Sequence, residues 1–217
     1  MKLLNFNKVL CLSPHPDDVE LGMMGTIMKH HETKFTVLCL TNGATKCLDG
    51  VNGKNRLKEV NDAWDTVSVS NVTLEFSDCI YLTDKDGDSE WINYIENNYI
   101  NSGEYDCIFL PTSEDSQFEH RFINGLGNAL IRSKPISLIE YRTPSTLNSW
   151  LPNTFINVEK YYSRKLVALT KFKTQQAKPY FKKSVLEAFH ANYQCRKKGI
   201  NLVEPFRTIE VYLGDLE

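Results

Sequence analysis

The sequence lacks several signatures that would assign it to a common functional class. Its six cysteines are scattered and form no CxxC pair, so neither a cysteine zinc knuckle nor a dithiol redox pair is indicated. Neither GxGxxG nor GxxxxGK[ST] occurs, so nucleotide binding by a glycine-rich loop has no support. The stretch DKDGDS at 84–89 has its glycine at the fourth position instead of the sixth and no glutamate at the twelfth, so we interpret it as an acidic turn and not as a calcium loop.

An excess of charge and a long hydrophobic run are also absent. The 25 basic and 27 acidic residues give a formal net charge of −2, so neither nucleic acid nor an anionic membrane is expected as a partner. The apolar stretches are strand-sized, and the first runs into charged residues without a small-residue cleavage site, so neither a membrane span nor a signal peptide is expected. We therefore expect a cytoplasmic protein. The sequence does not indicate its oligomeric state.

Short apolar runs alternate along the chain with longer segments of helical spacing. Strands are predicted at Val9–Leu12, Phe35–Leu40, Val72–Phe76, Asp106–Leu110, Ile136–Tyr141, Thr154–Val158 and Thr208–Leu213. Helices are predicted at Asp18–His31, Asn52–Val67, Glu90–Asn101, Glu119–Ser133, Glu159–Gln176 and Lys178–Lys198. This alternation predicts an α/β fold, a Rossmann-like three-layer sandwich with a mostly parallel sheet flanked by helices. No linker or low-complexity tract divides the 217 residues, so a single domain, 1–217, is expected.

The first polar cluster, SPHPDDVELG at 13–22, directly follows the first predicted strand. In open α/β sheets, ligands bind beyond the carboxyl ends of the strands, so this loop has the position of an active site. Two prolines stiffen the loop that carries His15, Asp17 and Asp18, which suits it to hold a metal. An alternative remains for this cluster taken alone: an aspartate N-cap, first-turn acids favoured by the helix dipole and an ordinary loop histidine.

A second polar cluster follows the fourth predicted strand, in DCIFLPTSEDSQFEHR at 106–121. It contains Asp115, Gln117, Glu119 and His120. If both strands are parallel, this cluster and His15 lie at the same end of the sheet. Two histidines and a carboxylate from separate strand ends match the three protein ligands of a catalytic zinc site, although such ligands also suit other divalent metals.

These motifs resemble the LmbE-like (PIG-L) family of zinc-dependent de-N-acetylases, which act on N-acetylglucosamine and related amino-sugar conjugates. The family's PHPDDxExG motif is present without a gap as Pro14, His15, Pro16, Asp17, Asp18, Glu20 and Gly22. Its DxHxDH motif corresponds to Asp115, Gln117, Glu119 and His120, and its RxxE motif to Arg56 and Glu59. Weaker likeness continues through LPNTFINVEKYYSRKLVALTKFKTQ to Glu204 and Phe206, so the resemblance covers nearly the whole chain.

The resemblance implies a role for each motif residue. His15, Asp18 and His120 would hold one zinc ion per chain, and Asp17 would remain free beside the metal as general base. Zinc lowers the pKa of a bound water towards ~7, and a carboxylate within reach can take its proton as the acetamide carbonyl is attacked. The products would be acetate and a free amino sugar.

One position departs from the family pattern. Gln117 stands where the family has a histidine that stabilises the oxyanion or protonates the leaving amine. A glutamine amide donates a hydrogen bond but cannot act as a proton acid near neutral pH. Either Asp17 carries both proton transfers, or the reaction is slower or uses an easier substrate. Glu119 keeps the charge of the family's aspartate and is expected, with Asp115, to orient His120, although Asp115 is alternatively a loop residue or a cap.

Substrate contacts are predicted at Arg56, whose guanidinium offers several fixed donors, and at Asn42, which follows the second predicted strand. The alternatives are a surface helix arginine paired with Glu59, and a turn residue without a ligand. Trp91 and Trp150, next to predicted loops, are candidates for stacking on a sugar.

The sequence thus predicts a zinc-dependent hydrolase that removes an N-acetyl group from an amino sugar, sugar nucleotide or glycoconjugate precursor. Two alternatives remain. One is an amidase of the same fold with a different acyl group or a non-sugar amide. The other is a catalytically weak homologue that binds metal or sugar, motivated by Gln117.

Overall fold

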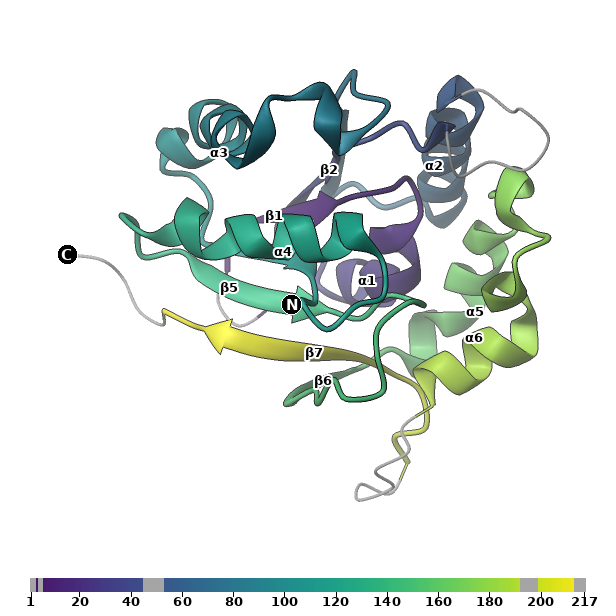
Figure 1. Cartoon of the computed structure of the whole chain (residues 1–217). Coiled ribbons are helices and arrows are strands. Elements are labelled where there is room, and N and C mark those ends of the chain that lie inside the picture. The colour runs from purple at the N-terminus through teal and green to yellow at the C-terminus, as the bar shows by residue number, and fades with distance from the viewer. Residues whose placement is uncertain (1–2, 4–5, 45–52, 192–198, 213–217) are drawn as a thin grey trace.

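A seven-stranded sheet with helices on both faces forms the protein, as the computed structural model in Figure 1 shows. The structure describes residues 3, 6–44, 53–191 and 199–212. The strands are β1 Lys8–Ser13, β2 Lys34–Cys39, β3 Val72–Phe76, β4 Cys107–Pro111, β5 Ser137–Tyr141, β6 Thr154–Asn157 and β7 Val203–Glu210. Their order is β3-β2-β1-β4-β5-β7-β6; the first five are parallel, β7 is antiparallel to β5, and β6 is antiparallel to β7. The predicted fold class is confirmed.

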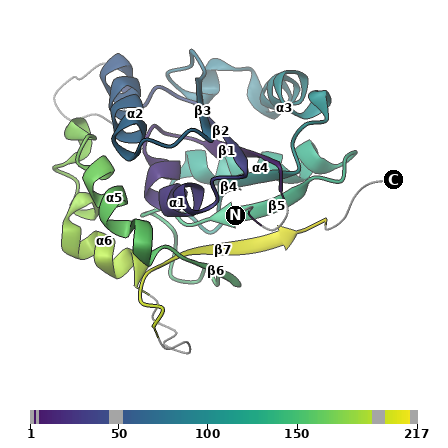
Figure 2. The ribbon, with the colours of Figure 1, turned by 180° about the vertical axis from the view of Figure 1, so that it is seen from behind.

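Six α-helices among the described residues cover this sheet. They are α1 Asp18–Lys29, α2 Gly53–Val67, α3 Gly87–Asn98, α4 Phe118–Ile131, α5 Glu159–Leu169 and α6 Lys183–His190. Helices α3 and α4 lie on one face, and α1, α2, α5 and α6 on the other, as Figure 2 shows from behind. None of the described helices is long and apolar enough to cross a membrane.

Alternate residues of the central strands pack into two separate cores. On β1, Val9 and Cys11 face the core beneath α1, α2, α5 and α6, whereas Leu10 and Leu12 face the core beneath α3 and α4. All four side chains are fully buried. A strand that is buried on both faces reads as a continuous apolar run, which explains why VLCL shows no polar alternation.

The late helices differ from their predicted ranges. The helix predicted at Glu159–Gln176 ends at Leu169 and is followed by a short 3-10 turn at Lys173–Gln175. The next predicted helix cannot begin at Lys178, because a residue before proline is disfavoured in the helical region; Lys178 is extended, with φ −72° and ψ 136°. Pro179–Phe181 forms a second 3-10 turn before α6, and the predicted extension over 192–198 lies outside the described residues.

The last strand begins earlier than Thr208, the predicted start. It spans Val203–Glu210 and includes two charged residues, Glu204 and Arg207. Both charges are paired: Glu204 with Lys165, and Arg207 with Glu140 and Glu114. Partners distant in sequence therefore make this strand possible, which local patterning does not reveal.

The order of the strands has a switch point between β1 and β4. Connections leave β1 towards β2 and β4 towards β5, in opposite directions across the sheet, so the strand order reverses between these two parallel neighbours. Ligands of open α/β sheets bind at such a reversal, outside the carboxyl ends of the strands. Both polar clusters of the sequence follow these two strands.

Candidate metal centre

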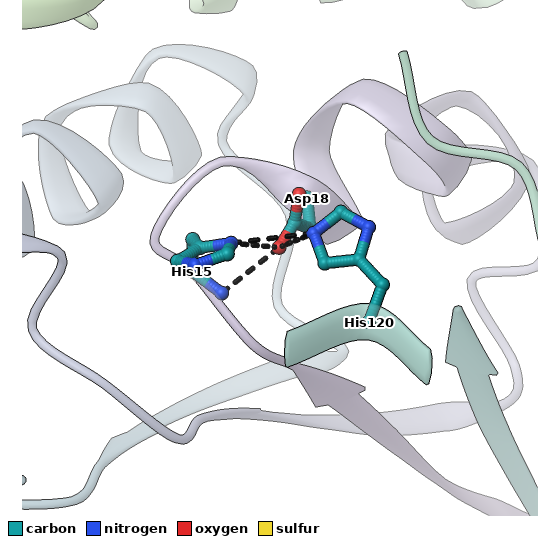
Figure 3. Close-up of side chains that lie close together, drawn as sticks. All are labelled: His15, Asp18 and His120. Atoms are coloured by element: carbon teal, nitrogen blue, oxygen red, sulfur yellow. Dashed lines mark hydrogen bonds and ion pairs between the residues drawn. The ribbon is translucent and has the colours of Figure 1, made fainter. Parts of the chain in front are cut away.

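Three side chains converge at the reversal between β1 and β4 (Figure 3). His15 follows β1, Asp18 begins α1, and His120 lies in the first turn of α4. Asp18 Oδ2 lies 3.1 Å from His15 Nδ1 and 3.3 Å from His120 Nε2, and the two histidine nitrogens are 3.3 Å apart. All three residues are buried.

The donor set and its spacing fit a tetrahedral metal. Zinc bonds of about 2.0–2.2 Å to imidazole nitrogen and carboxylate oxygen imply about 3.3–3.6 Å between neighbouring ligand atoms. The three measured separations of 3.1–3.3 Å are close to that range. Two imidazoles and one carboxylate leave one tetrahedral position for water or substrate, which is the pattern of a catalytic site.

A hydrogen-bonded group behind His120 sets its orientation. Asp115 Oδ2 lies 3.0 Å from His120 Nδ1, and Thr143 Oγ1 lies 3.2 Å from the same nitrogen. With Nδ1 donating to the Asp115 carboxylate, the lone pair of neutral His120 is on Nε2, the atom that faces Asp18. The arrangement prepares Nε2 for a metal.

The electrostatics of the three groups are strongly coupled. Burial alone would raise the pKa of Asp18, but His120 and His15 beside it lower that pKa below its ordinary value. Burial likewise opposes the charged form of His120, yet Asp18 and Asp115 raise its pKa to about 10. Because a metal takes the neutral imidazole, binding at this site would displace a proton from His120.

Asp17 lies beside these three residues but is held by a different partner. Its Oδ2 is 3.0 Å from Arg56 Nη2, and Arg56 also donates to the backbone oxygens of Pro16 and Gly43, at 3.2 and 3.3 Å. Arg56 is fully buried, so it is not a surface residue. The Glu59 carboxylate accepts hydrogen bonds from Thr174 N and Thr174 Oγ1. Gly43 has φ +66°, and a Cβ there would lie 2.6 Å from Arg56 Nη1, so glycine leaves room for the guanidinium.

Gln117 and Glu119 flank the same centre. Gln117 is the N-cap of α4, and its Nε2 donates to Ser145 Oγ at 3.4 Å, while Ser145 Oγ is 3.4 Å from His120 Nδ1. From the sequence, Glu119 is expected to orient His120. Its carboxylate lies 4.0 Å from Nε2 of the other histidine, His15. Asp115 occupies the predicted place behind His120.

A cavity opens over this centre. It is lined by His15, Asp17, Asp18, Leu21, Arg56, Gln117, Pro144, Ser145, Lys178 and Tyr180. The predicted contact residue Arg56 is in this lining and Asn42 is not; the Asn42 side chain accepts a hydrogen bond from Ala44 N at 3.0 Å. The two tryptophans considered for sugar stacking are buried, and their indole N–H groups donate to Leu82 O and to Glu140, so that prediction is wrong.

A family model now identifies the chain. The PIG-L model, described as GlcNAc-PI de-N-acetylase, matches residues 10–131, more than half of the chain. The chain belongs to the PIG-L family. The uncharacterized deacetylase YaiS of Escherichia coli is 26% identical over 171 residues, which cover 76% of this chain and 90% of that protein. Diacetylchitobiose deacetylase of Thermococcus kodakarensis is 38% identical over 79 residues, covering 33% of this chain and 30% of that protein.

Solved structures share the fold of this PIG-L protein. N,N'-diacetylchitobiose deacetylase from Pyrococcus horikoshii superposes with a TM-score of 0.71 at 20% identity, covering 95% of this chain and 85% of that chain. GalB, the 4-carboxy-2-hydroxymuconate hydratase of Pseudomonas putida, gives 0.70 at 13% identity and covers 97% and 99%. At these identities the likeness concerns the fold, which hosts more than one reaction.

The PIG-L match covers only part of the cavity. His15, Asp18, Arg56 and His120 lie inside the matched span, whereas Ser145, Lys178 and Tyr180 lie beyond it. Sequence reasoning missed these later residues. Ser145 follows β5, so the rule that ligands bind at strand ends would have found it. Lys178 and Tyr180 come from a turn between helices and carry no local signal.

Proposed function

We propose that this protein is a zinc-dependent hydrolase that removes an N-acetyl group from an amino sugar, sugar nucleotide or glycoconjugate precursor. The observation that carries the proposal is the joint geometry of His15, Asp18 and His120, with the Asp17 carboxylate beside them in a cavity. Membership of the PIG-L family and relatives named as deacetylases supply the reaction type.

Each residue has a defined task in this proposal. When bound, zinc supplies a Lewis acid that polarises a carbonyl and lowers the pKa of water. Asp17 takes the proton of the attacking water and passes it to the departing nitrogen, so that the amide and water become acetate and an amine. The Arg56 guanidinium, 3.0 Å away, orients the Asp17 carboxylate for both transfers.

Gln117 cannot supply the proton transfer that the family histidine would provide. Its amide, held by Ser145, donates a hydrogen bond to the developing oxyanion but cannot protonate the amine. Both proton transfers therefore fall to Asp17. The alternative is a binding protein that has lost turnover, and the replacement of the family histidine by Gln117 is the observation in its favour.

The test combines metal analysis with a fluorescent primary-amine assay. Purified wild type is expected to carry about one zinc per chain and to release amine from at least one N-acetylglucosamine conjugate in a panel. His15→Ala should lose both properties because it removes one of three protein ligands. His31→Ala, a change at an exposed histidine, should keep both and serves as the matched control.

Other outcomes separate the alternatives. Metal without amine release, with turnover gained by Gln117→His, would identify a site that has lost its general acid. Metal with release only from non-sugar amides would identify the amidase. A wild-type protein that binds no metal would contradict the proposal.

A further inference from the structure

Helix α1 carries the metal ligand Asp18 and is buried along almost its whole length, from Asp18 to Met28. Apolar contacts hold such a helix in the interior, but they are not directional and do not by themselves define its position along its axis. A shift by one residue would move Asp18 by about 1.5 Å. The centre needs a stricter restraint, because its ligand atoms are only 3.1–3.3 Å apart.

A buried lysine of α5 provides the first part of such a restraint. Lys165 Nζ donates to the Leu21 backbone oxygen of α1 at 2.7 Å, to His190 Nε2 at 2.7 Å and to Glu204 Oε1 at 2.5 Å. His190 Nδ1 lies 2.7 Å from the Leu186 backbone oxygen, so Nδ1 carries the proton and Nε2 accepts. All three ammonium protons of Lys165 therefore have acceptors, and the side chains of Lys165, Glu204 and His190 are fully buried.

Glu204 of β7 provides the second part. Its Oε1 accepts a hydrogen bond from Gly25 N at 2.9 Å, and its Oε2 accepts one from Thr26 N at 2.6 Å. Leu21 O and Gly25 N are the carbonyl and amide that an α-helix joins across one turn. Lys165 and Glu204 thus bind opposite ends of the same helical turn of α1. Because every residue has these backbone groups, the contacts hold the turn in place, and the lack of a Cβ at Gly25 determines which residue lies against Glu204.

Close packing reinforces this placement. A Cβ on Gly25 would lie 2.9 Å from Val158 Cβ and 3.0 Å from Glu204 Oε1. A Cβ on Gly22 would lie 2.7 Å from Arg142 O and from Tyr141 Cδ2. A one-residue shift of α1 would bring a side chain into each of these places.

We propose that Lys165, Glu204 and His190 form a positioning network that sets the register of α1 and thereby places Asp18 for metal binding. This inference rests on the metal site proposed above. Leu21, whose carbonyl Lys165 holds, also lines the cavity, so the network and the site share one turn of helix. Setting the register of packed elements is the best-attested role of buried polar and ionic groups.

The test compares two variants with a control that destabilises the protein away from α1. Lys165→Met with Glu204→Gln removes both charges and leaves no unpaired buried ion, whereas His190→Leu removes only one acceptor. The control is Ile95→Ala on α3, in the core on the other face of the sheet. Three readouts apply: the zinc dissociation constant by chelator competition, the visible spectrum of the Co²⁺ form, and amide hydrogen exchange of α1 in the metal-free protein.

The double variant is expected to bind zinc about 10–100-fold more weakly, as for groups that orient metal ligands, with an altered Co²⁺ spectrum and faster exchange in α1. His190→Leu should change the same readouts less. Ile95→Ala should lose stability yet keep the dissociation constant within about twofold, since it does not touch α1. If the double variant fails to fold, His190→Leu carries the same comparison.

A double variant with wild-type zinc affinity, Co²⁺ spectrum and α1 exchange would overturn the inference and reduce the network to a structural ion pair. A wild-type protein that binds no zinc would instead contradict the proposed function. In that case, the double variant still tests whether the network sets the register of α1. Amide exchange in α1 as slow as in wild type would contradict that role, and faster exchange would support it.

Discussion

Glu20 shows how strongly burial alters a carboxyl group at this site. It is fully buried on α1, its Oε1 accepts a hydrogen bond from Trp64 Nε1 at 2.7 Å, and burial is the main cause that raises its pKa to about 7. The neighbouring Asp17 and Asp18 raise the pKa further, while the Trp64 hydrogen bond lowers it. The residue is thus held close to its titration point at neutral pH.

The raised pKa of Glu20 predicts a pH-dependent loss of stability. The folded protein holds the proton more tightly than the unfolded chain, so the free energy of unfolding falls as the pH rises from about 4.5 through 7. Glu20→Gln keeps an acceptor for Trp64 and removes this loss. In urea denaturation of the metal-free protein, the free energy of unfolding of the variant relative to wild type should rise by up to about 3 kcal/mol between pH 5 and 8.

Glu187→Gln, a change at an exposed glutamate on α6, is the control for this measurement and should leave the pH profile unchanged. Parallel profiles for Glu20→Gln and wild type would show that Glu20 is ionised in the folded protein at no cost.

At the scale of elements, helix α4 carries two glycines in different surroundings. Gly125 is exposed, and a Cβ added there would meet nothing within 4 Å. Gly127 is buried against the sheet, where a Cβ would lie 2.7 Å from Leu110 Cδ2 and 3.3 Å from Leu138 Cδ2. One glycine therefore only weakens the helix, while the other allows α4 to approach β4 and β5.

The two glycines predict opposite responses to alanine. Gly125→Ala should raise the free energy of unfolding by about 0.5–1 kcal/mol, because alanine loses less backbone entropy on folding. Gly127→Ala should be less stable than Gly125→Ala by about 1–3 kcal/mol, since the added methyl overpacks the core. Urea denaturation of both variants tests this, and equal effects would mean that α4 moves freely on the sheet.

At the scale of the whole molecule, one sheet separates the two cores and supplies side chains to both. We propose on this ground that the chain is a single domain. Trp64 reports on the core beneath α1 and α2, and Trp91 on the core beneath α3 and α4. The candidate metal centre joins the segments after β1 and β4, which both cores share.

In single-tryptophan variants that keep Trp64 or Trp91, tryptophan fluorescence and far-UV circular dichroism should therefore show one coincident thermal transition. Zinc at about 100 times its dissociation constant should stabilise both equally by about 2.7 kcal/mol, a rise in Tm of roughly 5–10 °C for a chain of this length. His15→Ala should show no rise. Two separate transitions would divide the chain into independent units and contradict the single-domain proposal.

Local pattern was enough to predict the fold class and the neighbourhood of the site. Apolar runs alternate with helical segments, and polar residues follow the first and fourth runs, because parallel strands present their carboxyl ends at one edge of the sheet. The resemblance assigned His15, Asp18 and His120, and the structure brings these three side chains together. What the sequence determined by itself is therefore that the two polar clusters share one edge of the sheet, whereas the choice of these three residues within them rests on the resemblance.

Only the tertiary structure decided how these donors are supported. The pairs Arg56 with Asp17 and Lys165 with Glu204 join residues about forty positions apart, and the cavity wall at Tyr180 comes from a turn that local pattern assigned to a helix. The physical reason is that a buried charge is tolerated only where a partner meets it, and such meetings depend on how the helices and strands pack. Periodicity along the chain reports which face is buried and not which charges meet there.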